Sequence, residues 1–132
     1  QLEVDDETKP IIAVMTFTDA PSLPTASGSL VQNDLQLWVI KPGTIMTQKT
    51  FVGNIFEVNS WYSKKYGMLL PSNVDEEHNN VKVIRIDSNQ LNGPFTLQVS
   101  SFGINAIGVP GLDNGDENQD FALYVFNAVA AN

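Results

Sequence analysis

Residues 30–40, LVQNDLQLWVI, constrain the fold of this chain more than any other segment. From Leu35 to Ile40 the side chains alternate between two faces, and a period of two residues is typical of a β-strand with one buried face. The polar pair Asn33-Asp34 stands directly before this alternation, where burial without partners would be costly. The segment therefore predicts a strand that begins beside a polar pair. Such a pair suits a loop edge, a backbone hydrogen bond or a hard cation.

Other short segments have a similar character. They are rich in β-branched and aromatic residues and are bounded by Gly, Pro, Asn, Asp or Ser: 11–18, 45–52, 81–86, 95–101 and 121–128. None has a helical period over about three turns. The predicted fold class is therefore all-β, an antiparallel β-sandwich of jelly-roll type. Residues 121–128 are apolar on both faces, so we expect that strand inside a sheet rather than at its edge.

The length of 132 residues fits one domain. Residues 1–9, QLEVDDETK, are polar and acidic, and we expect them to be an exposed lead-in or linker. Residues 10–132 then form a single β-sandwich domain, with a frayed tail at 129–132. Residues 55–80 predict a long excursion, which in a compact domain usually has a function or is partly mobile.

The composition excludes several classes of protein. The formal net charge is −8, and an acidic surface repels phosphate groups, so we expect no nucleic-acid partner. The chain has no cysteine, which excludes disulfides, thiol catalysis and zinc–thiolate sites. It has no run of about 20 apolar residues, so we expect no membrane span.

The order of several segments resembles a known family. These segments are FTD at 17–19, LVQNDLQL at 30–37, FVGN at 51–54, HNNVKVIRI at 78–86, GPFTLQVSS at 93–101 and DFALYVFNA at 120–128. In this order they are similar to the non-catalytic, P-domain-like C-terminal domain of subtilisin-like serine peptidases. The resemblance implies a jelly-roll β-sandwich joined to a catalytic protease domain in the same parent chain, in an extracellular, secreted protein.

The resemblance implies no catalysis by this domain, and the residues agree independently. A Ser–His–Asp triad needs an activated Ser beside a His base. The single histidine, His78, stands in an acidic loop before a strand, and no nucleophile turn of the G-x-S-x-G type accompanies it. We therefore expect that this chain is not an enzyme. Its expected role is to stabilise the catalytic domain or to aid engagement of a protein or polysaccharide substrate.

Calcium is the candidate cofactor, because it binds six to eight oxygens from carboxylates, amides and carbonyls. One loop gathers such oxygens: Asp113, Asn114, Asp116, Glu117, Asn118 and Asp120. Its spacing is only loosely like that of an EF-hand, and an acidic solvated loop is the alternative. A second cluster is Asp19, Asn33 and Asp34, provided that the first two strands are neighbours. There the alternative is a side-chain to backbone network that holds a loop.

Trp61, Tyr62 and Tyr66 are candidate ligand-binding residues, close to Lys64 and Lys65. Aromatic rings on a loop stack on sugar rings or bind a protein partner. The alternative is that the rings fold back over the sheet as a local core. A carbohydrate-binding module or lectin-like domain that uses these aromatic residues is therefore the second functional hypothesis.

Overall fold

The computed structural model describes residues 1–20, 32–41, 51–65, 79–104 and 119–131. These residues form β1 (Leu2–Val4), β2 (Ile11–Phe17), β3 (Asn33–Ile40), β4 (Phe51–Val52), β5 (Val81–Ile86), the 3₁₀ helix η1 (Ser88–Gln90), β6 (Thr96–Ile104), β7 (Phe121–Phe126) and β8 (Ala128–Ala130). Every strand pair among them is antiparallel. The prediction of an all-β fold with antiparallel sheets is therefore confirmed, whereas the jelly-roll sandwich stays a prediction.

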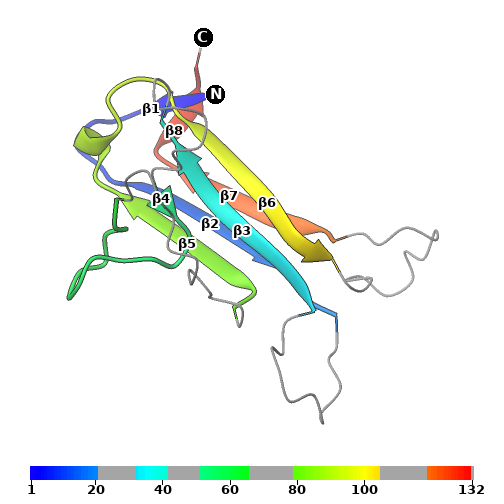
Figure 1. Cartoon of the computed structure of the whole chain (residues 1–132). Coiled ribbons are helices and arrows are strands. Elements are labelled where there is room, and N and C mark those ends of the chain that lie inside the picture. The colour runs from blue at the N-terminus through cyan, green and yellow to red at the C-terminus, as the bar shows by residue number, and fades with distance from the viewer. Residues whose placement is uncertain (21–31, 42–50, 66–78, 105–118, 132) are drawn as a thin grey trace.

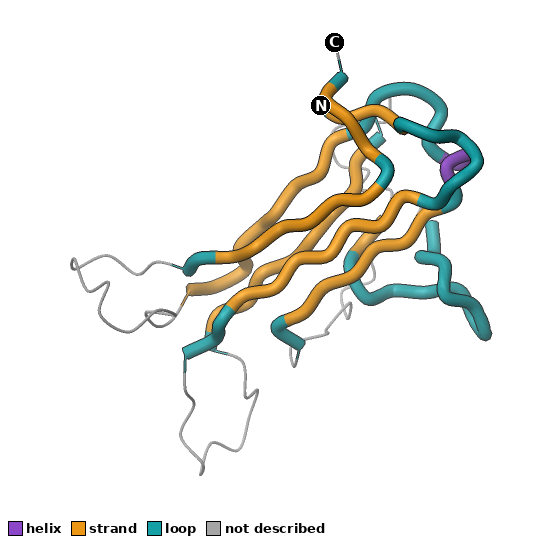
Figure 2. The backbone as a smooth tube through the Cα atoms, turned by 180° about the vertical axis from the view of Figure 1, so that it is seen from behind, coloured by secondary structure: helices purple, strands orange, loops and turns teal. Residues whose placement is uncertain are grey.

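The strands form two three-stranded sheets, with the orders β5-β2-β7 and β4-β3-β6, and a two-stranded sheet of β1 and β8. Figure 1 shows the long strands of the two larger sheets lying along roughly the same line, with their arrows pointing both ways. Strands β1 and β8 lie together at one end, beside both termini. Figure 2 shows the same arrangement from behind. Strands β2 and β3, which are consecutive among the long strands, thus belong to different sheets.

The two larger sheets share one hydrophobic core. Buried residues alternate along β2, as a period of two requires when one face is covered. The core consists of Ile11, Ala13, Met15, Phe17, Leu35, Leu37, Val39, Phe51, Ile84, Ile86, Leu91 and Phe95. Complete burial of a large apolar side chain contributes about 1.5–3 kcal/mol, so these alternating residues supply the main force that holds the sheets together.

The first residues differ from the predicted exposed lead-in at 1–9. Leu2–Val4 forms β1, which pairs with β8, and Leu2 and Val4 pack against the core. The Leu2 N–H donates to the Phe95 carbonyl at 2.8 Å, and the Phe95 N–H donates to the Leu2 carbonyl at 2.7 Å. The same pairing places Ala128–Ala130 in β8, although a frayed tail was expected at 129–132. Acidic residues stand next to Leu2 and Val4 in the sequence, and for this reason the alternation of this short strand was not recognised.

The position of β7 also differs from the prediction. We expected this strand inside a sheet, but among the described strands it pairs with β2 alone and ends the order β5-β2-β7. Its residues are mostly exposed. Apolar residues on both faces of a segment show only that the segment is hydrophobic. They do not determine how many neighbouring strands cover it. The predicted strand at 45–52 is described only at its end, as β4, and residues 45–50 lie outside the described residues.

Candidate functional site

The Asp19 carboxylate follows β2 and binds the chain at the start of β3. Its Oδ1 accepts hydrogen bonds from the N–H groups of Ala20 and Asn33, and its Oδ2 accepts one from Gln32 N–H, each at 2.9 Å. A carboxylate offers about four lone-pair sites, so these donors use most of them. Asp19 and Asn33 therefore lie in contact, although their strands belong to different sheets and are not the neighbours on which the expected cluster depended. The contact is of the side-chain to backbone kind.

Further amides extend this polar network to β7. The Asn33 side chain is fully buried, and its Nδ2 donates to Gln119 Oε1 at 2.7 Å. The Gln119 Nε2 in turn donates to the carbonyls of Thr18 at 3.0 Å and Asp120 at 2.7 Å. Because β2, β3 and β7 all begin or end here, the network fixes one end of both sheets.

Asn80 attaches β5 to the same end of the molecule. Its Nδ2 donates to the Phe17 carbonyl at 3.1 Å, and the Phe17 N–H donates to the Asn80 carbonyl at 3.1 Å. We call the set of Asp19, Asn33, Asn80 and Gln119 the polar junction. The Asn80 and Gln119 amides satisfy main-chain carbonyls where a strand ends, which is where sheet hydrogen bonding stops, and Asn33 binds the Gln119 side chain.

Only some of the predicted calcium ligands lie within the described residues. Asp113, Asn114, Asp116 and Asn118 lie outside the described residues, whereas Asp120 is exposed beside β7, and Asp34 is half-buried in β3. Within the described ranges, no three residues of the Asp, Glu, His or Cys types gather as a metal site. Calcium binding stays a prediction, both for the 113–120 loop and for the cluster of Asp19, Asn33 and Asp34.

Residues 55–64 form a small hairpin, called here the 55–64 hairpin. Phe56 pairs with Ser63, and the Glu57 N–H donates to the Tyr62 carbonyl at 2.9 Å. At its tip the Ser60 N–H donates to the Glu57 carbonyl, and Asn59 has a φ of 57°, which Asn tolerates better than most residues. In Figure 1 this green segment projects away from the sheets near β5.

The base of the hairpin is attached to β5. The Ser63 N–H donates to the Arg85 carbonyl at 2.7 Å, and the Arg85 N–H donates to Ser63 Oγ at 3.0 Å. The Tyr62 ring lies 4.8 Å from the Arg85 guanidinium carbon, a cation–π contact that typically contributes about 0.5–1 kcal/mol at an exposed site. Tyr62 therefore folds back over the sheet, which is the alternative reading for this residue.

Trp61 has the opposite environment. Its side chain is 82% exposed, and the nearby Val58 is 89% exposed. Trp61 therefore does not join a local core but is displayed on a hydrogen-bonded hairpin, beside the polar side chains of Asn59 and Ser60. The third predicted aromatic, Tyr66, lies outside the described residues.

Gly53 and Asn54 carry a structural role that the sequence reasoning missed. The Gly53 N–H donates to the Leu37 carbonyl of β3, and the Asn54 N–H donates to the Val83 carbonyl of β5, both at 2.9 Å. The Asn54 side chain accepts from the Val83 N–H at 2.8 Å and donates to the Val81 carbonyl at 2.8 Å. The pair therefore connects the two sheets along one edge, and we call it the edge strap.

Each residue of the edge strap suits its position. A Cβ on Gly53 would lie 2.8 Å from Gln36 Oε1 and 2.9 Å from Lys82 Cβ, closer than side chains approach. Asn54 has a φ of 64°, which Asn adopts more readily than most residues. The Gly-Asn dipeptide of the FVGN segment was the available signal, and it carried no structural role in the prediction.

The described part of the chain contains no helix with the length and apolarity that crossing a bilayer requires. Comparison with protein-family models, with curated proteins and with solved structures found no match to this chain.

Proposed function

We propose that this chain is a non-catalytic accessory domain of a secreted subtilisin-like serine protease. It would stabilise the catalytic domain in the same parent chain or help it to engage substrate. One observation supports this proposal above others: the segments that carry the resemblance also supply the residues that connect the strands. Asp19, Asn33, Gly53, Asn54 and Asn80 all belong to those segments.

The chemistry of these residues makes the resemblance more specific than shared hydrophobicity. A carboxylate at position 19 binds the main chain at the start of β3, and only a residue without a Cβ fits at position 53. Alternating apolar residues occur in every half-buried strand, whereas these polar and glycine positions depend on how strand ends meet. Their agreement with the family pattern therefore supports a shared arrangement of strands.

The experiment compares the parent reading frame with a version that lacks this domain. We expect the shortened protease to lose activity faster on heating, because its catalytic domain loses a stabilising neighbour. Hydrolysis of a short chromogenic peptide measures the catalytic domain itself, and hydrolysis of a polymeric substrate measures engagement. A parent reading frame without the Asp, His and Ser blocks of a subtilase would overturn the proposal.

The exposure of Trp61 favours a second candidate function, carbohydrate binding. A flat indole with neighbouring polar side chains suits stacking on a sugar ring, with Asn59 and Ser60 as hydrogen-bond partners. A glycan array and affinity electrophoresis on soluble polysaccharides test this candidate. We expect Trp61→Ala to abolish binding and Val58→Ala, on the same hairpin, to retain it. No retention by any polysaccharide would reject this second candidate.

A further inference from the structure

Asn92 is the one asparagine of the described residues that stands directly before a glycine. The pair Asn92-Gly93 lies in the loop between η1 and β6, and both residues are exposed. Gly93 has a φ of 87°, and a Cβ placed on it would meet nothing within 4 Å. The main chain at Gly93 therefore faces open space, and water reaches the pair freely.

No hydrogen bond holds this pair in place. Among the described residues, none of the hydrogen bonds involves the Asn92 side chain or the Gly93 N–H. Asn59 provides a contrast, because the N–H of the residue that follows it, Ser60, donates to the Glu57 carbonyl at 3.1 Å. The main chain after Asn92 therefore has a freedom to rotate that the main chain after Asn59 lacks.

We propose that Asn92 is a site of spontaneous deamidation, a covalent modification that converts its side-chain amide into a carboxylate. The Gly93 nitrogen attacks the Asn92 Cγ and forms a cyclic succinimide, and the side-chain nitrogen leaves as ammonia together with the proton of the Gly93 N–H. Water then opens the ring at either carbonyl and gives aspartate or isoaspartate. Water is consumed and ammonia is released in equal amounts, so the reaction needs no oxidant and no enzyme. This proposal does not depend on the proposed function.

Two features of the loop favour the first step. The main chain must rotate to bring the Gly93 nitrogen onto the Asn92 Cγ, and glycine rotates with the least steric resistance. This rotation breaks no hydrogen bond of the pair, whereas at Asn59 the hydrogen bond of Ser60 must open first. We therefore expect the fold to protect Asn59 and to leave Asn92 about as reactive as it is in the unfolded chain.

The product alters the surroundings of β1. Asn92 lines a pocket of about 310 Å³ together with Glu3 and Glu7, so a carboxylate at position 92 adds a further negative charge where like charges repel. Isoaspartate also adds a methylene group to the main chain shortly before Phe95, whose N–H and carbonyl bond to Leu2. Deamidation should therefore weaken the attachment of β1 and lower the stability of the fold.

Peptide mapping by mass spectrometry tests the proposal on the unaltered chain. The chain is kept at mildly alkaline pH, either folded in buffer or unfolded in guanidinium chloride, and is then digested with chymotrypsin. Cleavage after Phe95 separates position 92 from Asn114-Gly115, a second such pair that lies outside the described residues. We expect Asn92 to convert at nearly the same rate in both states, with isoaspartate as the main product. Asn59 should convert at least about tenfold more slowly in the folded chain than in the unfolded one.

Asn92→Gln is the matched variant for the effect on stability. It keeps an amide at an exposed position but closes the corresponding ring far more slowly, so position 92 should stay unconverted. We expect the thermal midpoint of the parent to fall on storage by more than that of the stored Asn92→Gln variant, and equal falls would overturn the expected effect on β1. A folded rate at Asn92 below about a tenth of its unfolded rate, or conversion of Asn59 as fast as that of Asn92 in the folded chain, would overturn the proposal.

Discussion

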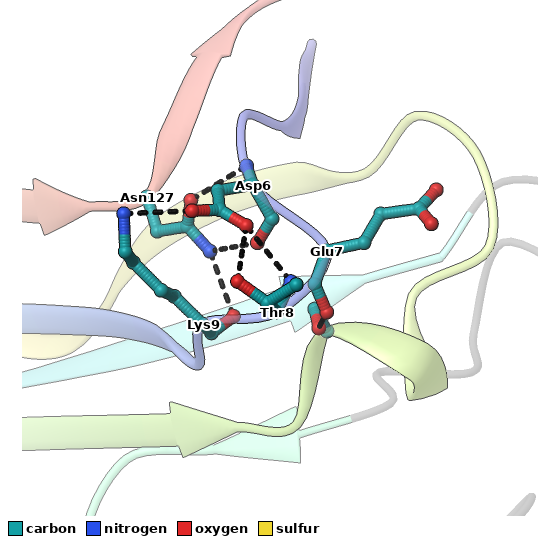
Figure 3. Close-up of polar contacts among 6 residues, drawn as sticks. Asp6, Glu7, Thr8, Lys9 and Asn127 are labelled. Atoms are coloured by element: carbon teal, nitrogen blue, oxygen red, sulfur yellow. Dashed lines mark hydrogen bonds and ion pairs between the residues drawn. The ribbon is translucent and has the colours of Figure 1, made fainter.

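Asn127 joins the first and last segments of the chain, and its replacement tests how much this connection contributes to stability. The residue lies between β7 and β8 with a φ of 62°. Its Oδ1 accepts from the Asp6 N–H, and its Nδ2 donates to the carbonyls of Asp6 and Lys9, each at 2.8 Å (Figure 3). The side chain therefore holds the turn after β1 against the strand that β1 pairs with.

The expected cost follows from these contacts. A hydrogen bond contributes about 1 kcal/mol, and partial exposure lowers the total for this group to about 2 kcal/mol. Alanine at a positive φ adds about 1 kcal/mol, whereas glycine adds none. We therefore expect Asn127→Ala to lower the free energy of unfolding by about 3 kcal/mol and Asn127→Gly to lower it by about 2 kcal/mol.

Thermal unfolding by circular dichroism measures both variants. In a domain of this size each kcal/mol moves the midpoint by about 3–5 °C, so we expect a fall of about 10 °C for alanine and about 7 °C for glycine. Asn89→Ala is the control, because Asn89 is exposed in η1 and should change stability by less than about 0.5 kcal/mol. An Asn127→Gly midpoint within about 2 °C of the parent would refute the hydrogen-bond argument. Equal midpoints for alanine and glycine would refute the backbone argument.

Three further predictions concern other parts of the molecule. Gly53→Ala should lower the free energy of unfolding in urea by about 1–3 kcal/mol, since its Cβ would crowd both sheets, and an unchanged midpoint would contradict the edge strap. The Lys9 ammonium and Thr8 hold the pKa of Asp6 well below its ordinary value of 3.8. The contacts of the ionised Asp6 carboxylate therefore stabilise the fold fully above about pH 3.8, and this stabilisation is lost as the pH falls toward the lowered pKa. The stability difference between the parent and Asp6→Asn should therefore shrink as pH falls from about 6 to about 2, and a constant difference would contradict it. If calcium binds the 113–120 loop, a hundredfold excess over its dissociation constant should add about 2.7 kcal/mol, and chelator or Asp116→Ala should remove that gain.

The strands could be predicted from the sequence because their signal is local. The segment at 81–86 coincides with β5, and the segment at 11–18 differs from β2 by one residue. Both segments are rich in β-branched residues, and in both the structure buries every second residue on one side. A cluster of Asp19 and Asn33 was expected only if the first two strands are neighbours; the two residues lie in contact although those strands belong to different sheets. Which sheet each strand joins was not predictable in this way, because pairing depends on residues distant in sequence.

The two edges of the molecule show where sequence reasoning needs more than hydrophobicity. At the β5 edge, Gly53 and Asn54 break the strand pattern, yet they bond to both sheets and leave that edge covered. At the β7 edge the residues are apolar on both faces without interruption, yet Phe121 and Leu123 remain exposed. Among the described strands, the broken pattern therefore lies at the covered edge, and the uninterrupted neutral one lies at the end of the order β5-β2-β7. The reason is physical: protecting an edge requires a charge, a bulge or a crossing residue, each of which interrupts the alternation.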